Sequence, residues 1–186
     1  MSEAVKELPP VEYLRELLDY DPETGVLTWR ERPLEMFKTE RGCNAWNTRY
    51  AGKEAGCVDT KPSGYQSVLV RLNGKRWMGH RLAFALYYGR DPGLEIDHVN
   101  RVSTDNRICN LRAVDHSRNV QNRVTPYRNN TSGYLGVSWA KREQKWLAHI
   151  RINGKKKHLG YFDAPEAAHT AYLTAKAKHH SGAVVA

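Results

Sequence analysis

A short stretch of the chain, from Ile96 to Asn122, gathers residue types that could together hydrolyse a phosphodiester bond. That reaction needs a base that deprotonates water, a cation that neutralises charge on the phosphate, and a scaffold that holds both. Asp97 offers a hard carboxylate oxygen, His98 an imidazole that titrates near neutral pH, and Asn119 an amide oxygen. Each residue alone could equally cap a turn or face solvent, so the hypothesis depends on their joint spacing.

A strand–loop–strand–helix unit has to position these side chains. The sequence predicts a strand that ends at Asp97-His98, a polar loop that runs to Asn110, and a second strand over Leu111–Val114. Asp115 is a typical N-cap for a helix that reaches about Asn122. The predicted order places the Asp-His pair at a strand end and Asn119 on the helix.

The residues before this unit predict a hairpin and a helix. Tyr65–Leu72 and Lys75–Met78 are joined by Asn73-Gly74, a pair that accepts the positive φ angles of a tight turn. His80–Tyr88 follows as a short apolar helix, and Gly89 ends it.

This region resembles the HNH nuclease motif, in the subgroup typical of phage and intron homing endonucleases, where asparagine replaces the last histidine. The resemblance is loose over residues 11–122 and tight over 80–122. The matching pieces are the pair Asp97-His98, the loop Asp105-Asn106-Arg107, the run Asn110-Leu111-Arg112, the helix carrying Asn119 and Asn122, and the lead-in His80-Arg81-Leu82-Ala83.

The resemblance implies a role for each of the central residues. His98 would be the general base, Asp97 and Asn119 would hold a divalent metal, Mg²⁺ or Mn²⁺, and Asn110 would tie the loop together and orient His98. His116 and Asn122 share the helix with Asn119 at spacings of three, so either could compete as the helix ligand.

Other residues keep open roles. Arg107 is a further possible site residue, and His80 could contact phosphate or pack against the hairpin. The three cysteines, Cys43, Cys57 and Cys109, contain no CxxC pair, so no structural zinc is expected.

The positive charge is concentrated in the last third of the chain. The whole chain has a net charge of +9. From Arg123 onward there are 11 Lys/Arg against 3 Asp/Glu, whereas the preceding residues carry 18 against 17. A charge gathered in this way is typical of a surface that binds a polyanion.

The same region predicts a separate small fold. A polar linker leads to strands over Gly136–Ala140, Lys145–Ile152 and Lys155–Tyr161, with a second Asn-Gly turn between the last two. A helix then begins in the run Asp163-Ala164-Pro165-Glu166, where Asp163 is predicted as the N-cap.

Residues 133–182 resemble the Apetala/ethylene-response-factor type of DNA-binding domain. The matching pieces are Gly136-Val137, Lys145–Arg151, Leu159–Phe162, Glu166–Ala168 and Ala171-Tyr172. The resemblance implies a three-stranded sheet in the major groove of double-stranded DNA, braced by the helix. Ser138, Ala140 and His158 stand where that family has arginine and tryptophan contacts, so base preference does not carry over.

Strand alternation assigns the two faces of this sheet independently. It turns Ala148, Ile150 and Ile152 toward the helix. The predicted DNA-binding residues are His149 and Arg151 beside Leu147 on the opposite face, Lys156 and His158 on the next strand, and Lys141, Arg142 and Lys145 for phosphates around the first turn.

The predicted fold class is α+β: a ββα-metal (HNH) nuclease core preceded by a β-hairpin and helix, plus a C-terminal three-stranded antiparallel sheet packed on one helix. The predicted domains are 1–122 for the nuclease region, 123–132 for a linker and 133–186 for the DNA-binding domain. Residues 11–20 are expected to be helical and 26–29 a strand, while 30–63 show no regular pattern.

The predicted function is a divalent-metal-dependent DNA endonuclease of phage or homing type that nicks DNA as a monomer. The alternative is a DNA-binding regulator whose HNH scaffold has lost activity, and intact Asp97, His98, Asn110 and Asn119 favour the enzyme. An RNA-binding module is less favoured, since no aromatic stacking motif stands out. The N-terminus has no apolar targeting segment, so a cytoplasmic location away from membranes is expected.

Overall fold

The computed structural model describes residues 7–126 and 129–180, and the chain divides into two compact units, Met1–Val114 and Asp115–Ala186. Both units mix helices with small antiparallel sheets, so the predicted α+β class is confirmed. The predicted domain division after Asn122 remains a prediction. No helix among the described residues has the length and apolar character needed to cross a membrane.

The first helix is shorter than predicted. Helix α1 covers Val11–Leu17, and Leu18–Tyr20 forms strand β1 instead of a last helical turn. Strand β1 pairs antiparallel with β2, Leu27–Trp29, in the register Leu18↔Trp29. Pairing with a strand that arrives later in the chain outweighs the local helical spacing, and it buries Leu18 in the core.

The prediction that residues 30–63 are irregular was wrong. They contain the 3₁₀ turn η1, Leu34–Met36, helix α2, Glu40–Tyr50, and strand β3, Cys57–Thr60. Helix α2 has a local signal that could have revealed it, because the Thr39 side chain caps it by accepting from the Gly42 N–H. Strand β3 has no such signal and is fixed by its pairing with β4.

The predicted hairpin is present and carries a third strand. Strands β4, Gln66–Leu72, and β5, Lys75–Met78, pair antiparallel, and β3 adds to the other side of β4. Helix α3, Gly79–Tyr88, follows directly and ends at Gly89, whose left-handed conformation closes the helix as predicted.

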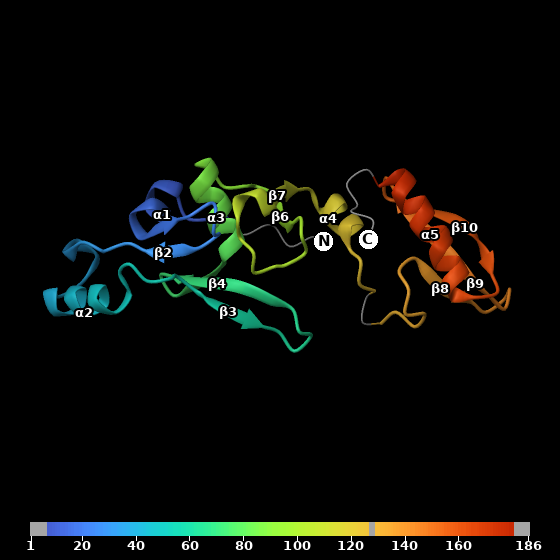
Figure 1. The fold of residues 1–186 in the computed structure, drawn as a ribbon, viewed down its shortest axis with the longest axis horizontal. Helices are drawn as coiled ribbons and strands as arrows, with labels where there is room; N and C mark the ends of the chain where they lie inside the picture. Colours follow the sequence, from blue (N-terminus) through green and yellow to red (C-terminus); the bar gives the residue numbers. More distant parts are fainter. Residues whose placement is uncertain (1–6, 127–128, 181–186) are drawn as a thin grey trace. The chain divides into compact units, whose positions relative to one another are not determined.

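Helix α3 is the centre of the first unit. It packs against α1, β1, β4 and β5, and Figure 1 shows it next to α1. One side buries Leu82 and Ala85 in the main core beside Leu14. The other side places Ala83 and Phe84 in a smaller cluster under the strands that follow. The helix therefore connects the N-terminal hairpin, formed by β1 and β2, with the predicted catalytic strands.

The predicted catalytic strands pair as expected. Strand β6, Glu95–His98, and strand β7, Leu111–Val114, are antiparallel with His98 opposite Leu111. The connection between them, called here the 99–110 loop, ends in the 3₁₀ turn η2, Ile108–Asn110.

Helix α4, His116–Asn122, begins the second unit. As predicted, Asp115 caps it, because its side chain accepts from the Arg118 N–H at 2.8 Å.

The rest of the second unit is the predicted three-stranded sheet with one helix across it (Figure 1). Its strands are β8, Val137–Ala140, β9, Lys145–Ile152, and β10, Lys155–Phe162, in the order β10-β9-β8. Helix α5, Pro165–His179, packs on β9 and β10, and its Ala168 is fully buried against Val137 and Ala148.

One capping prediction in this unit was wrong. The N-cap of α5 is Ala164, with no side-chain hydrogen bond, while Asp163 forms an ion pair with the Lys145 ammonium at 3.0 Å. Pro165 at the first helical position needs no N–H partner, which reduces the demand for a cap.

Candidate functional site

His98 lies at the end of β6 with its ring almost completely enclosed. The residue is 8% exposed, and its Nε2 lies 3.2 Å from Asn106 Oδ1 across the 99–110 loop. An amide oxygen can only accept, so Nε2–H donates this bond, and in the neutral ring the lone pair is then on Nδ1. A neutral histidine with one nitrogen anchored in this way can take a proton at the other.

A second histidine holds the ring of His98 from the side. His80, at the start of α3, contacts His98 with ring centroids 5.1 Å apart and planes at 89°. Burial, with smaller contributions from His98 and Arg81, lowers the pKa of His80 to about 3. His80 is therefore neutral near neutral pH. This ring contact is with His98, whereas the predicted packing was against the hairpin, so both predicted roles of His80 stay predictions.

Asp97 is next to His98 in sequence and points to the other face of β6, as strand alternation requires. Its Oδ2 accepts from the Arg112 side chain on β7, at 3.0 Å from Nε and 2.8 Å from Nη2. Arg112 lies opposite Asp97 in the strand pairing, so the ion pair is built into the register.

Asn110 fastens both ends of the 99–110 loop. Its Oδ1 accepts from the Asn100 N–H at 2.8 Å, and its Nδ2 donates to the Asp105 carbonyl at 2.8 Å. Its own carbonyl accepts from the Val99 N–H at 2.9 Å. The side chain is buried, and these bonds match the loop-tying role predicted for it.

Arg107 is committed to a neighbour within the same loop. Its Nε and Nη2 donate to the two carboxylate oxygens of Asp105 at 2.8 and 2.6 Å. The bonds from Arg107 hold the pKa of Asp105 well below its usual range. Arg107 thus stiffens the loop in the structure, and a contact with substrate stays a prediction.

The remaining nuclease candidates lie on α4. His116, Asn119 and Asn122 share this helix at spacings of three residues, as predicted. Helix α4 belongs to the second compact unit, while Asp97 belongs to the first. The pairing of Asn119 with Asp97, and the choice among the three helix residues, therefore stay predictions.

The donor set suits a cation that needs few protein ligands. Among the described residues there is no group of three His, Cys, Asp or Glu side chains that could hold a metal ion. One carboxylate and one amide oxygen fit Mg²⁺, which keeps several waters and takes phosphate oxygens as further ligands. The residues predicted to hold the cation are compatible with that chemistry.

Two residues that support His98 were missed as site residues. Asn106 was noted within the loop but given no role, and it is the partner of the His98 ring. Tyr20 lies on β1, and its hydroxyl donates to the Asn106 carbonyl at 2.8 Å. The asparagine could have been suspected from the loop itself, whereas nothing local points to Tyr20.

The C-terminal sheet brings several of the predicted DNA-binding residues together. Lys156 is paired with Arg151, and His158 with His149, across the β9–β10 ladder, so all four share one side of the sheet. Tyr161 was not predicted to join them, but its ring lies 4.7 Å from that of His158. These residues are called here the outer face: His149, Arg151, Lys156, His158 and Tyr161.

The charges on the outer face are uneven. Arg151, Lys156 and His158 are exposed, while His149 is half-buried. Burial, followed by the nearby Lys156, Arg151 and His158, lowers the pKa of His149. The lowered pKa favours the neutral form of His149, which is two residues from Arg151 along β9, on the same face as Arg151 and Lys156.

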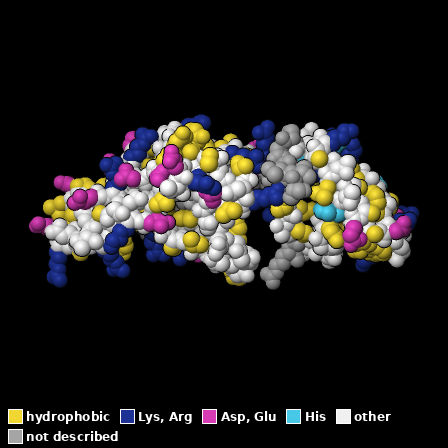
Figure 2. All heavy atoms as spheres, viewed as in Figure 1, with side chains coloured by type: hydrophobic (Ala, Val, Ile, Leu, Met, Phe, Trp, Pro, Cys, Tyr) yellow, Lys and Arg dark blue, Asp and Glu magenta, His cyan; other side chains and the backbone are white. Residues whose placement is uncertain are grey.

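The other predicted phosphate-binding residues lie at the opposite end of the sheet from Arg151. Lys141 and Arg142 are exposed in the β8–β9 turn, and Lys145 begins β9. Arg151 is six residues further along this strand, roughly 20 Å at the usual rise. The structure therefore separates the predicted residues into two basic groups, and Figure 2 shows Lys and Arg at the surface of both units.

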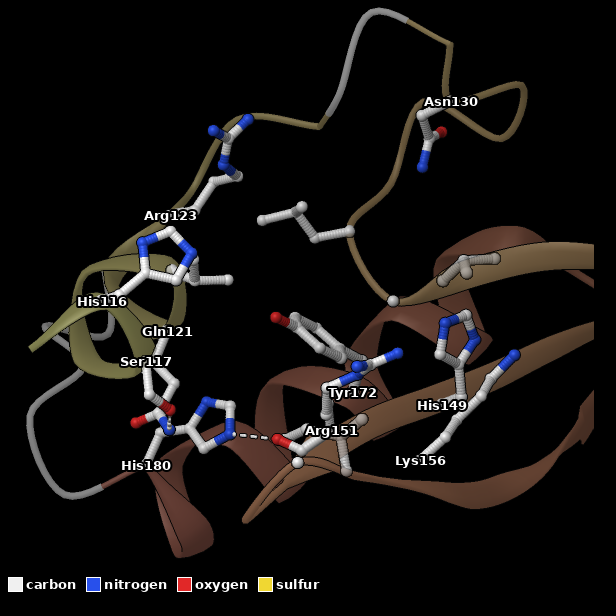
Figure 3. A pocket seen from close by; sticks show the side chains of 16 residues that line it. His116, Ser117, Gln121, Arg123, Asn130, His149, Arg151, Lys156, Tyr172 and His180 are labelled. Carbon is white, nitrogen blue, oxygen red and sulfur yellow. Dashed lines mark hydrogen bonds between the residues drawn. The ribbon is translucent and has the colours of Figure 1, made fainter. Parts of the chain in front are cut away.

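A pocket of about 750 Å³ lies within the second unit. Its wall includes His149, Arg151 and Lys156 from the sheet and His116 from α4 (Figure 3). The His180 ring also lines it and donates from Nε2 to the Arg151 carbonyl at 3.0 Å. Three residues of the outer face thus line this pocket together with α4 and α5.

Comparison with known proteins identifies the family. The family model described as HNH endonuclease matches residues 78–121, a span that contains the predicted nuclease residues His80, Asp97, His98, Arg107, Asn110, His116 and Asn119. Protein 3.8 of Escherichia phage T7 is 31% identical over 87 residues, which are 47% of this chain and 71% of that protein. The chain belongs to the HNH endonuclease family and is a nuclease.

A solved structure also aligns with most of the chain. It is titled "DNA binding and cleavage by the HNH homing endonuclease I-HmuI", and the alignment covers 95% of both chains at 21% identity. The TM-score of 0.40 is too low to establish a common arrangement.

Proposed function

We propose that this nuclease is a divalent-metal-dependent DNA endonuclease of the phage or homing type, in which His98 is the general base. The observation that carries the proposal is the enclosed His98 ring, anchored at Nε2 and next in sequence to Asp97 within the family-matched segment. A base anchored at one nitrogen presents the other in a fixed direction, which is what proton abstraction from a water requires.

Each of the proposed site residues has a separate role in the reaction. His98 Nδ1 accepts a proton from the attacking water, and Asn110 keeps the 99–110 loop closed around it. Asp97 and Asn119 are the proposed ligands of Mg²⁺ or Mn²⁺. A bound divalent cation supplies neutralisation of the charge that develops on the phosphate and the leaving oxygen.

The second part of the proposal assigns double-stranded DNA to the C-terminal domain, residues 133–186. Support comes from the basic outer face on a regular three-stranded sheet and from the excess of 11 Lys/Arg over 3 Asp/Glu after residue 122. Arg151 and Lys156 would contact phosphates, and His149, which lies next to them on the same face, would suit a base edge.

Conversion of a supercoiled plasmid tests the function directly. In Mg²⁺ or Mn²⁺ the full chain should produce open circles, and a chelator should stop the reaction. Cleavage in excess chelator would contradict the metal dependence. DNA binding with no cleavage in either metal would favour a regulator with an inactive nuclease scaffold.

The time course also tests whether the chain nicks DNA as a monomer. One chain supplies one His98 and can attack one phosphodiester at a time. Open circles should therefore accumulate well before linear product, at a rate proportional to enzyme concentration. Immediate linear product with second-order dependence on enzyme would indicate a dimer instead.

A further inference from the structure

The N-terminal hairpin reaches the predicted catalytic loop from more than 80 residues away. The Tyr20 hydroxyl donates to the Asn106 carbonyl, and the Ile108 N–H donates to the Pro22 carbonyl at 3.1 Å. Gly25 closes the hairpin turn with φ +78°, and a Cβ there would lie 2.5 Å from the Arg107 nitrogen. The turn between β1 and β2 is therefore fitted against the backbone that carries Asn106.

Asn106 itself is held from several directions. It is 3% exposed, and its side-chain amide lies against Gly79, where a Cβ would come within 3.1 Å of Nδ2. Its Oδ1 accepts from His98 Nε2–H at 3.2 Å. With its Oδ1 facing the ring, the buried Asn106 amide favours the His98 tautomer that is protonated at Nε2, because the other tautomer would leave two acceptors facing each other.

Tyr20 links this arrangement to the core of the unit. Its ring packs against both the main cluster and the smaller cluster under β6 and β7. Burial, followed by the neighbouring Asp21, raises the pKa of Tyr20, so the hydroxyl remains a donor at any working pH. The hydrogen bond from this hydroxyl can therefore fix the position of the Asn106 backbone.

We propose that Asn106 and Tyr20 are positioning residues for His98: Asn106 fixes its tautomer, and Tyr20 fixes Asn106. The catalytic consequence rests on the proposed function of His98 as the general base, whereas the tautomer does not. With the proton held at Nε2, the free Nδ1 lone pair is the one available to a water.

The tautomer is measured on the full chain labelled with ¹⁵N-histidine, in long-range ¹H–¹⁵N spectra at pH 8, with His98→Ala used to assign the signal. The wild type should show His98 protonated at Nε2. In Asn106→Leu, which keeps the size and removes the acceptor, the two tautomers should become mixed. Asn106→Asp keeps an acceptor and should restore the Nε2–H form.

Plasmid nicking gives the second readout. Asn106→Leu should lower kcat by about 10- to 100-fold, as is typical when the partner that orients a functional histidine is lost, with little change in KM. Asn106→Asp should recover part of that loss. Tyr20→Phe should lower kcat roughly threefold, equivalent to part of one hydrogen bond.

Tyr13→Phe is the matched control, because Tyr13 packs on the same core and its hydroxyl accepts from Asn73 in an exposed turn. It should leave kcat unchanged. An unchanged His98 tautomer in Asn106→Leu, or equal kcat in Tyr20→Phe and Tyr13→Phe, would overturn the corresponding half of the proposal. If Asn106→Leu does not fold by circular dichroism, Asn106→Ala and Tyr20→Phe provide the same two measurements. Full activity of His98→Ala would refute the proposed base while leaving the tautomer result valid.

Discussion

The 99–110 loop and the outer face of the C-terminal sheet prepare their side chains in opposite ways. In and beside the loop, three side chains are buried and each is held by a hydrogen bond: His98 at the end of β6, and Asn106 and Asn110 in the loop. On the outer face, Arg151 and Lys156 are exposed and are placed by strand register. The contacts around the loop fix the orientation of the His98 ring, whereas the sheet distributes positive charge over an exposed surface.

This difference follows from the two kinds of work. The rate of proton abstraction falls steeply when the base is displaced by about 1 Å, so the neighbours of the base must restrict its conformation. Attraction to phosphates changes slowly with distance and tolerates mobile side chains. Substitutions in the loop should therefore act on the rate of cleavage, and substitutions on the outer face should act on affinity and its salt dependence.

The largest effect is expected at the two residues that end β6. His98→Ala should lower the cleavage rate by at least about 10²-fold, the usual effect of losing a general base. Asp97→Ala should abolish metal-dependent cleavage. Neither change alters the basic second unit, so DNA affinity in a gel-shift assay should stay close to that of the wild type.

Arg112→Met controls for the ion pair, because it removes the partner of Asp97 and leaves the carboxylate. It should retain most of the activity. A variant as inactive as Asp97→Ala would mean that the ion pair, and not a metal-binding carboxylate, is what cleavage requires.

A smaller effect, on affinity alone, is expected at Arg151→Ala and Lys156→Ala. Each should reduce the slope of log affinity against log salt by about 1, since each removes one phosphate contact. The cleavage rate at saturating DNA should not change. Lys178→Ala removes an equal charge from an exposed position on α5 and is the control. An equal loss of slope there would show that net charge, and not the outer face, drives binding.

The pH dependence of the free energy of unfolding should show whether His80 in the first unit is held neutral. Because the pKa of His80 falls from its usual 6.5 to about 3 on folding, the unfolded chain binds this proton first as pH decreases. The contribution of His80 is complete above pH 6.5 and is lost as pH falls toward 3. The slope approaches about 1.4 kcal/mol per pH unit.

His80→Phe keeps a ring against His98 and removes the titrating group. Urea titrations between pH 7 and 4 should give this variant a shallower decline in the free energy of unfolding than the wild type. Parallel curves for the two proteins would mean that His80 is not held neutral.

The smallest effects are expected on stability, at the residues that precede the two helices of the second unit, α4 and α5. Asp115→Ala should weaken α4 by about 1 kcal/mol, because it removes the cap on the Arg118 N–H. Asp163→Ala should change stability by less than about 0.5 kcal/mol, since an exposed ion pair contributes little. Amide hydrogen exchange in α4 and α5 measures both, and equal losses would contradict the capping difference.

The sequence alone was sufficient at several boundaries where the signal is local. The Asn-Gly turn after Leu72, the glycine after Tyr88 and the aspartate before His116 each mark an element boundary that the structure reproduces. The pair Asp97-His98 also ends a strand as its place in the sequence predicts, and Asn110 bonds within the loop as the family resemblance implies. Short-range spacing fixes which side chains a strand end and its loop can offer.

Tertiary structure decided the features that depend on distant segments. Strand β1 forms because β2 pairs with it, and β3 forms because β4 offers an edge. The partner of Asn106 is Tyr20, 86 residues away, and the tight fit of Gly25 against Arg107 spans a similar interval. Local propensities are worth fractions of a kcal/mol, and packing between distant segments outweighs them. The sequence therefore indicated which residues are candidates for the chemistry of this nuclease, while the fold decided which of their neighbours contact His98.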